Sequence, residues 1–128
     1  MPTHPTISDA EWEVMLILWD QSPLTAGEVV QRLEGRRDWN PRTIKTLLNR
    51  LLKKQAIGFN TQQNRYLYFP KVTKETCIRV ESRSFAARVF GGATGPMLVQ
   101  FVRQANLSPQ EIEQLTKVLK EKSRLQEE

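Results

Sequence analysis

Apolar positions in residues 8–20 recur every three or four residues, as they do on one face of an amphipathic helix. Ser8 and Glu11 have the spacing of a capping box, in which each side chain accepts a hydrogen bond from the backbone N–H of the other residue, so the helix is predicted to begin there. Asp20 and the following Gln21-Ser22-Pro23 predict its end. The residues expected on its buried face are Trp12, Met15, Leu16 and Trp19.

Two further helices are predicted before residue 55. Thr25 and Glu28 form a second capping box, and Leu24 just before them is expected to form a very short strand. The third helix begins after Asn40, a favourable N-cap, with Pro41 at the first helical position, where its missing N–H costs nothing. Its continuous apolar stripe consists of Ile44, Leu47, Leu48, Leu51 and Leu52.

Aromatic and branched residues predict two strands, 57–60 and 65–69, joined by a polar tip at 61–64 and stopped by Pro70. Residues 8–70 therefore have the order helix, helix, helix, hairpin, which is that of a winged helix-turn-helix. The rest is predicted to be helical, over 73–90, 96–105 and a helix that starts at the capping box of Ser108 and Glu111 and frays over 121–128.

The fold class expected is mainly α with a small β-hairpin, comprising a winged helix-turn-helix domain at residues 1–71 and a helical dimerisation domain at 72–128. Three short amphipathic helices can scarcely enclose a core of their own, so we expect them to pack against a second copy in a two-fold dimer. The residues expected in this dimer contact are Ile78, Phe85, Val89, Leu98, Phe101, Val102, Ile112, Leu115 and Leu119.

The distribution of charge favours a nucleic-acid partner. The net charge is +5 and the sequence pI is about 9.7. The basic residues concentrate between Arg36 and Lys54, where Asp38 is the one acidic residue, whereas the first helix is acidic. A basic segment on one element is the pattern of a DNA-binding surface.

The exposed face of the third helix carries hydrogen-bond donors and positive charge, which a helix in the DNA major groove requires. Arg42 suits a guanine edge and the Thr46 methyl suits thymine. Arg50, Lys53 and Lys54 suit phosphates, and Lys45 and Asn49 share the face, with Thr43 on its flank. Arg65 is expected at the DNA backbone or minor groove, and Trp39 either at the sugar–phosphate or as an aromatic staple that fixes the start of the helix.

An ordinary solvated helix face would show the same residues. The preceding helix and turn, the following hairpin and the near absence of acidic residues favour DNA binding. A winged-helix protein-interaction module with only non-specific nucleic-acid binding is the alternative. An enzyme ranks last, because no nucleophile–base pair, metal constellation or phosphate loop is visible.

Candidate cofactor chemistry is minimal. Cys77 is the one cysteine and His4, in a Pro-flanked tail expected to be disordered, the one histidine, so we expect no metal site, no cofactor and no small-molecule ligand. Cys77 is expected to be a buried structural thiol. No signal-peptide pattern or membrane-spanning run is present, which predicts a cytoplasmic protein without membrane insertion.

Several motifs strongly resemble the penicillinase repressor family: Ile7-Ser8-Asp9-Ala10-Glu11-Trp12-Glu13-Val14-Met15, Asp38-Trp39-Asn40-Pro41-Arg42-Thr43-Ile44-Lys45-Thr46-Leu47, Gly91-Gly92, Leu98-Val99-Gln100-Phe101-Val102 and Leu107-Ser108-Pro109-Gln110-Glu111-Ile112-Glu113. The resemblance implies a homodimeric repressor of a β-lactamase or related resistance operon that binds double-stranded dyad operator DNA. It also implies base contacts by Arg42 and Thr46, with Thr43, Lys45 and Arg50 in supporting or phosphate contacts.

The same resemblance implies a mode of induction. Family members are inactivated by proteolysis in the dimerisation domain when a membrane sensor-protease pathway detects a β-lactam. The matching bond here is Gln100-Phe101, where the family has Asn-Phe. The resemblance alone favours repression over activation.

Overall fold

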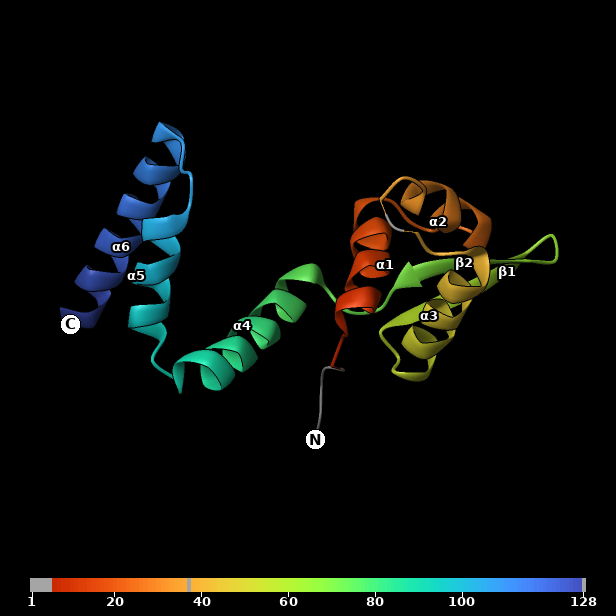
Figure 1. Cartoon of the computed structure of the whole chain (residues 1–128), viewed down its shortest axis with the longest axis horizontal. Coiled ribbons are helices and arrows are strands. Elements are labelled where there is room, and N and C mark those ends of the chain that lie inside the picture. Colours follow the sequence, from red (N-terminus) through yellow and green to blue (C-terminus); the bar gives the residue numbers. More distant parts are fainter. Residues whose placement is uncertain (1–5, 37, 128) are drawn as a thin grey trace. The chain divides into compact units, whose positions relative to one another are not determined.

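The computed structural model describes residues 6–36 and 38–127 of the 128-residue chain. The tail that contains His4 lies outside the described residues, as do Arg37 and Glu128. The elements follow one another as α1 Asp9–Asp20, α2 Ala26–Leu33, α3 Pro41–Lys53, β1 Ile57–Gln62, β2 Arg65–Pro70, α4 Lys74–Phe90, α5 Thr94–Gln104 and α6 Pro109–Glu127 (Figure 1). The chain forms two compact units, an N-terminal unit that ends at Ser82 and a C-terminal unit that begins at Arg83, so the division lies inside α4.

Local hydrogen bonds fix where the first two helices begin. Ser8 Oγ accepts from the Glu11 amide at 3.1 Å, and Glu11 Oε1 accepts from the Ser8 amide at 2.9 Å. Thr25 and Glu28 make the same pair of bonds at 3.2 and 2.9 Å. Both predicted capping boxes are therefore confirmed.

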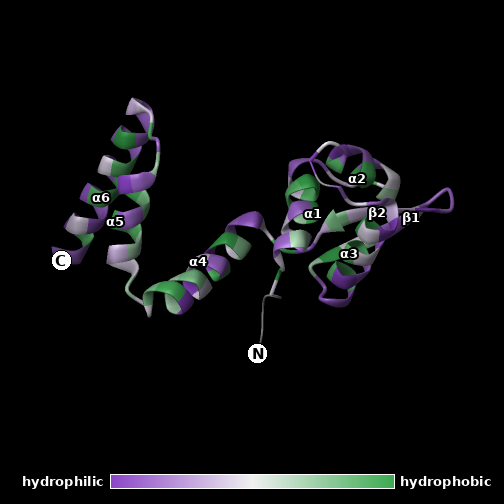
Figure 2. Ribbon diagram, in the orientation of Figure 1, coloured by the Kyte–Doolittle hydropathy of each residue, from purple (hydrophilic) through white to green (hydrophobic). Residues whose placement is uncertain are grey.

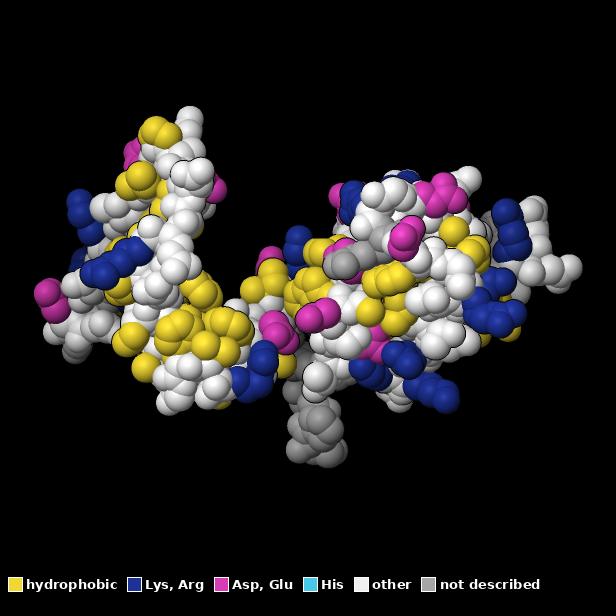
Figure 3. Space-filling model, viewed as in Figure 1, with side chains coloured by type: hydrophobic (Ala, Val, Ile, Leu, Met, Phe, Trp, Pro, Cys, Tyr) yellow, Lys and Arg dark blue, Asp and Glu magenta, His cyan; other side chains and the backbone are white. Residues whose placement is uncertain are grey.

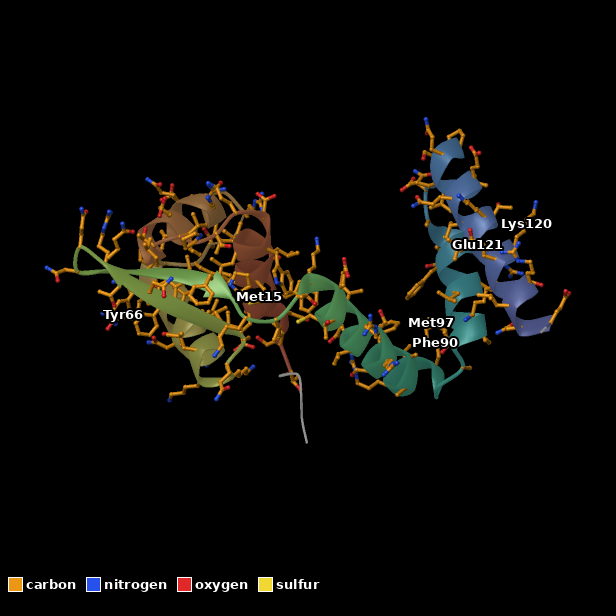
Figure 4. The ribbon with its side chains drawn as sticks, turned by 180° about the vertical axis from the view of Figure 1, so that it is seen from behind. Met15, Tyr66, Phe90, Met97, Lys120 and Glu121 are labelled. Carbon is orange, nitrogen blue, oxygen red and sulfur yellow. The ribbon has the colours of Figure 1, made fainter. Side chains whose placement is uncertain are left out.

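The core of the N-terminal unit lies between α1, α2, α3 and the hairpin. Leu24 joins the segment before α2 to the hairpin, because it exchanges two backbone hydrogen bonds with Tyr68, at 2.7 and 3.0 Å. The predicted short strand at Leu24 is thereby confirmed as an isolated bridge. Met15, labelled on α1 in Figure 4, is fully buried. The other core side chains include Val14, Leu18, Val29, Leu33, Ile44, Leu48, Leu51 and Ile57.

The buried face of α1 differs from the predicted one. Val14, Met15 and Leu18 have no exposed surface, whereas Trp12, Leu16 and Trp19 are half-buried. The indole N–H explains the position of Trp19, because a buried donor requires an acceptor. Its Nε1 donates to the Val72 carbonyl at 2.9 Å, and its ring meets that of Trp12 edge to face at 5.5 Å.

The hairpin is longer and its tip shorter than predicted. Gln62 still pairs with Arg65, so Gln63 and Asn64 alone form the tip, with φ of 51° and 63°. Two central residues with positive φ match the right-handed twist of the flanking strands, which is why a two-residue turn closes this hairpin where four loop residues were expected. Pro70 ends β2 as predicted.

A glycine pair ends α4 as predicted. Gly91 and Gly92 have φ of 60° and 86°, the left-handed conformation that ends many helices, and the Gly92 amide donates to the Ala86 carbonyl at 2.9 Å. In the C-terminal unit, Phe85, Phe90 and Phe101 form an aromatic cluster with ring centroids 5.7 to 6.4 Å apart. Figure 4 labels Phe90 and Met97 at this corner between α4 and α5.

The last helix begins at the predicted capping box, with bonds of 2.9 and 3.1 Å between Ser108 and Glu111. It does not fray after residue 120 as expected, and continues to Glu127. Strong helix formers (Lys, Glu, Arg, Leu and Gln) make up most of residues 121–127, which explains the greater length. None of the side chains of α6 is buried, and polar and apolar residues alternate along it (Figure 2).

Candidate nucleic-acid interface

The start of α3 is fixed as the sequence predicts. Asn40 Oδ1 accepts from the Thr43 amide at 2.9 Å, and Pro41 is the first residue of the helix. Trp39, immediately before the cap, is half-buried and packs against the core. This packing favours the aromatic staple that was one of the two roles considered for Trp39.

The two faces of α3 separate by polarity. Ile44, Leu47, Leu48 and Leu51 are buried in the core. The opposite face of the helix is exposed to solvent, and it carries the predicted DNA-binding residues Arg42, Lys45, Thr46, Asn49, Arg50 and Lys53, with Thr43 half-buried on its flank. No acidic residue lies in α3, so the charges that α3 places on this face are all positive.

Hydrogen bonds to the backbone and the cap orient the two threonines of this face. Thr46 Oγ1 donates to the Arg42 carbonyl at 3.0 Å, and Thr43 Oγ1 lies 3.3 Å from Asn40 Oδ1. Because the hydroxyl hydrogen of Thr46 is used inside the helix, the groups that it can offer to DNA are a methyl group and an oxygen acceptor. A methyl group of this kind suits contact with thymine.

Lys54 was predicted to suit a phosphate, and in the structure its side chain forms an ion pair with Glu11. Its Nζ donates to Glu11 Oε1 at 2.5 Å and to the Thr6 carbonyl at 2.8 Å. Glu11 is only 1 % exposed, and a buried carboxylate requires a cationic partner. Burial raises the pKa of Glu11, but the bonds from Lys54 and Ser8 outweigh it and hold the pKa below its ordinary value of 4.5.

An open groove of about 750 Å³ lies between the start of α2, the start of α3 and the hairpin. Its lining includes Thr25, Gly27, Pro41, Lys45, Arg65 and Tyr66. Lys45 belongs to the exposed face of α3, so the groove continues that face toward the hairpin. Figure 3 shows Lys and Arg side chains at the end of the N-terminal unit formed by α3 and the hairpin.

Arg65 stands at the base of the hairpin tip and is exposed, as predicted. Its charge acts on Glu28 at the start of α2. The Thr25 amide and hydroxyl lower the pKa of the exposed Glu28 carboxyl, and the charges of Arg32 and Arg65 add to this effect. Arg65 is also part of the lining of the groove.

The aromatic side chains of the hairpin were not among the predicted site residues. Phe59 and Tyr66 stack with ring centroids 4.2 Å apart and planes at 28°, and both are largely exposed. Tyr68 beside them is buried, and burial, with a smaller effect of Tyr66, raises the pKa of its hydroxyl. Strand alternation signals such a pair only when the register is known, because a one-residue shift exchanges the two faces.

The residues predicted for dimerisation are mostly exposed. Ile78, Val89, Leu98, Phe101, Val102, Ile112, Leu115 and Leu119 all have between 38 % and 63 % of their surface accessible. Phe85 is half-buried in the aromatic cluster of the C-terminal unit. Figure 3 shows hydrophobic side chains on the surface where α4 meets α5.

Other candidate chemistry is absent from the described part of the chain. Cys77 is buried, and burial raises the pKa of its thiol, which confirms the structural role predicted for it. Within residues 6–36 and 38–127, no three His, Cys, Asp or Glu side chains lie close enough to hold a metal ion. None of the helices in these ranges is long and apolar enough to cross a membrane.

Known proteins with similar sequences cover nearly the whole chain. Residues 7–121 match the sequence model of the penicillinase repressor family. The penicillinase repressor of Bacillus licheniformis is 36% identical over 121 residues, which are 94% of this chain and 94% of that protein. The methicillin resistance regulatory protein MecI of Mammaliicoccus sciuri is 34% identical over 116 residues, covering 91% of this chain and 94% of that protein.

Two solved structures resemble the N-terminal part of the chain. The solution structure of the DNA-binding domain of the repressor BlaI is 38% identical, with a TM-score of 0.52, and the match covers 58% of this chain and 90% of that domain. The monomeric form of Bacillus licheniformis BlaI in complex with the blaP half-operator is 37% identical, with a TM-score of 0.51 and coverage of 59% and 92%. The predicted winged-helix fold is confirmed, and the chain belongs to the penicillinase repressor family of transcriptional regulators, which are not enzymes.

Proposed function

We propose that this chain is a homodimeric transcriptional repressor that binds dyad operator DNA and blocks transcription of a β-lactamase or related resistance operon. The observation that carries the proposal is the exposed face of α3, which has hydrogen-bonding and basic residues and no acidic residue, in a chain of the penicillinase repressor family. The relative whose structure includes a half-operator supports DNA as the partner.

Within this proposal, α3 lies in the major groove. Arg42 and Thr46 contact bases, because a guanidinium matches the guanine edge and a methyl group matches thymine. Lys45, Asn49, Arg50 and Lys53 make backbone or supporting contacts, together with Thr43 on the flank of the helix. Arg65 contacts the backbone or minor groove from the hairpin, and the exposed part of Trp39 lies at the sugar–phosphate.

Residues 72–128 provide dimerisation and residues 1–71 bind DNA. The apolar side chains exposed on α4, α5 and α6 support this division, since so many of them on one segment indicate a surface that is covered in the functional state. A two-fold dimer presents two α3 helices to successive major grooves about 34–36 Å apart, which matches an operator with dyad symmetry.

Induction by proteolysis between Gln100 and Phe101 is the remaining part of the proposal. This bond lies inside α5, and Phe101 belongs to the aromatic cluster. Cleavage there would separate the DNA-binding unit from α6 and so lower operator affinity. Mass spectrometry of the protein from cells that express a β-lactam sensor-protease tests this step, and an intact Gln100–Phe101 bond during induction would contradict it.

The experiment that tests the proposed function is a fluorescence-anisotropy titration on DNA from upstream of the gene for this chain, with a scrambled duplex of equal length as control. Specific repressors bind their sites 10³- to 10⁷-fold more tightly than random DNA, as an order-of-magnitude range. We expect tight binding to the upstream duplex that is lost on the scrambled duplex. Equal and steeply salt-dependent binding to both would support the protein-interaction module instead.

A further inference from the structure

Two exposed aromatic side chains set the hairpin apart from the rest of the N-terminal unit. Among the described residues, the large apolar side chains with more than a third of their surface exposed all belong to α4, α5 or α6, except Phe59 and Tyr66. These two are 41 % and 50 % exposed. They stack on each other, so one continuous aromatic surface faces solvent beside polar and basic residues.

The position of Tyr66 indicates what this surface contacts. Tyr66, labelled on the hairpin in Figure 4, lines the groove between the hairpin and α3, as Lys45 and Arg65 do. Lys45 belongs to the face of α3 assigned to the major groove, and Arg65 belongs to the hairpin assigned to the backbone or minor groove. One sugar–phosphate strand always separates a major groove from the adjacent minor groove. With Lys45 at the major groove and Arg65 at the adjacent minor groove or backbone, the groove that Tyr66 lines is the place for that strand.

The lining matches the chemistry of a DNA strand. Phosphates alternate with deoxyribose sugars along the strand, so anionic and largely apolar C–H surfaces follow each other. The lining of the groove includes two basic residues, Lys45 and Arg65, and the aromatic Tyr66. Phe59 supports that ring from the other strand of the hairpin, so little conformational freedom is lost when DNA binds.

We propose that this groove holds one strand of the operator and that Tyr66, supported by Phe59, packs against a deoxyribose between phosphates bound by Lys45 and Arg65. This inference rests on the DNA binding proposed above and adds an aromatic sugar contact to it. The contact does not depend on base sequence, and a neutral ring displaces no counterions from DNA.

The test is a titration of Tyr66→Ala on the upstream and scrambled duplexes across a salt series. We expect affinity about tenfold weaker on both duplexes, corresponding to roughly 1.4 kcal/mol. The slope of log affinity against log salt stays at the wild-type value. Arg65→Ala differs, because loss of a phosphate contact makes that slope less steep by about 0.9.

Matched variants separate the ring from the fold of the hairpin. Tyr66→Phe keeps the ring and recovers most of the affinity, and Phe59→Ala causes a smaller loss because Tyr66 remains. Gln31→Ala is the control, because Gln31 is exposed on α2 and is not part of the lining of the groove. Gln31→Ala leaves affinity unchanged. Thermal unfolding monitored by circular dichroism verifies that every variant is folded.

If the wild type binds the upstream duplex, two outcomes would overturn the proposed Tyr66 contact without affecting the proposed function. The first is wild-type affinity of Tyr66→Ala on both duplexes, which would leave the aromatic surface to a protein partner. The second is a loss confined to the upstream duplex, or one that comes with a lower salt slope, because either would indicate a base or charge contact. If the wild type binds neither duplex, the proposed function itself fails.

Discussion

In the N-terminal unit the apolar side chains of α1 and α3 lie inside, whereas those of α5 and α6 lie largely on the surface. Val14, Leu18 and Leu51 have no exposed area, but Leu119 is 63 % exposed and Val102 is 48 % exposed. Both segments show apolar residues at helical spacing in the sequence. The pattern therefore predicts that a helix has a face to bury, and it does not predict which element covers that face.

The difference follows from the number of layers in each unit. In the N-terminal unit three helices and a hairpin surround one cluster of side chains, and Leu24 ties the hairpin to the segment before α2. The C-terminal unit has the end of α4, α5 and α6, which bury little beyond Ala86 and Met97. A helical unit with so small a core needs a partner to complete it. A second copy of the chain is the partner that we propose.

Leu119→Asp is the substitution with the largest expected effect, because it tests whether the exposed apolar face of α6 is a contact between two copies of the chain. A charge placed in an apolar contact between two copies is buried without a partner, which is costly. We expect the variant to be monomeric in sedimentation equilibrium and to bind a dyad operator at least about a hundredfold more weakly, because avidity is lost.

Gln114→Asp is the matched control, since it makes the same charge change at an exposed polar position of α6. It should remain dimeric. A dimeric Leu119→Asp variant with full affinity would show that this face of α6 is not part of the contact.

Within the N-terminal unit, Lys54→Met should destabilise the fold and leave DNA contacts in place. It leaves Glu11 buried without its cation, and we expect a loss of roughly 2–3 kcal/mol in the free energy of unfolding, below the usual range for buried pairs because Lys54 is 35% exposed. Urea denaturation measures the loss. Under conditions where the variant is folded, its salt slope on DNA should equal that of the wild type. A less steep slope for the variant would indicate that Lys54 contacts a phosphate.

Local signals in the sequence were sufficient for the helix starts and for the exposed face of α3. The caps at Ser8, Thr25 and Asn40 depend on residues within three positions of each other, and all three are confirmed. The ion pair of Glu11 with Lys54 joins residues 43 positions apart, so no local pattern predicts it. The stack of Phe59 on Tyr66 depends on hairpin register, which the two-residue tip decides. The contacts that we propose for the α6 face involve a second copy of the chain, which no pattern within one chain specifies.

Arg42→Ala and Lys53→Ala test whether these two residues of α3 contact bases and phosphates, respectively. Arg42→Ala should weaken binding to the operator by about tenfold or more and affect scrambled DNA less, because a base contact carries specificity. Lys53→Ala should weaken both about equally and lower the salt slope by about 0.9. Anisotropy titrations on both duplexes measure these effects. Equal losses of affinity and equal changes of the salt slope for the two variants on both duplexes would contradict the assignment of Arg42 to bases.

The smallest predicted effect is a pH dependence from Glu11. Its pKa in the folded protein lies below the ordinary value of 4.5, so its ionised form stabilises the fold above that pH, and the contribution is lost as the pH falls through the folded pKa. The difference in unfolding free energy between wild type and Glu11→Gln should therefore shrink between about pH 6 and about pH 3. Urea titrations at both pH values test this, and a constant difference would exclude an ionised Glu11.

In the proposed mechanism, residues 1–71 bind a half-site and residues 72–128 join two chains on one operator. Footprinting first locates the bound segment upstream of the gene. The measurement then compares the affinity and the number of chains bound on this segment with those on a duplex of equal length in which one half of the dyad is scrambled. We predict two chains on the intact duplex and an affinity on the order of a hundredfold or more above that for the half-scrambled duplex. Equal affinity for the two duplexes, with one chain bound to each, would contradict the account.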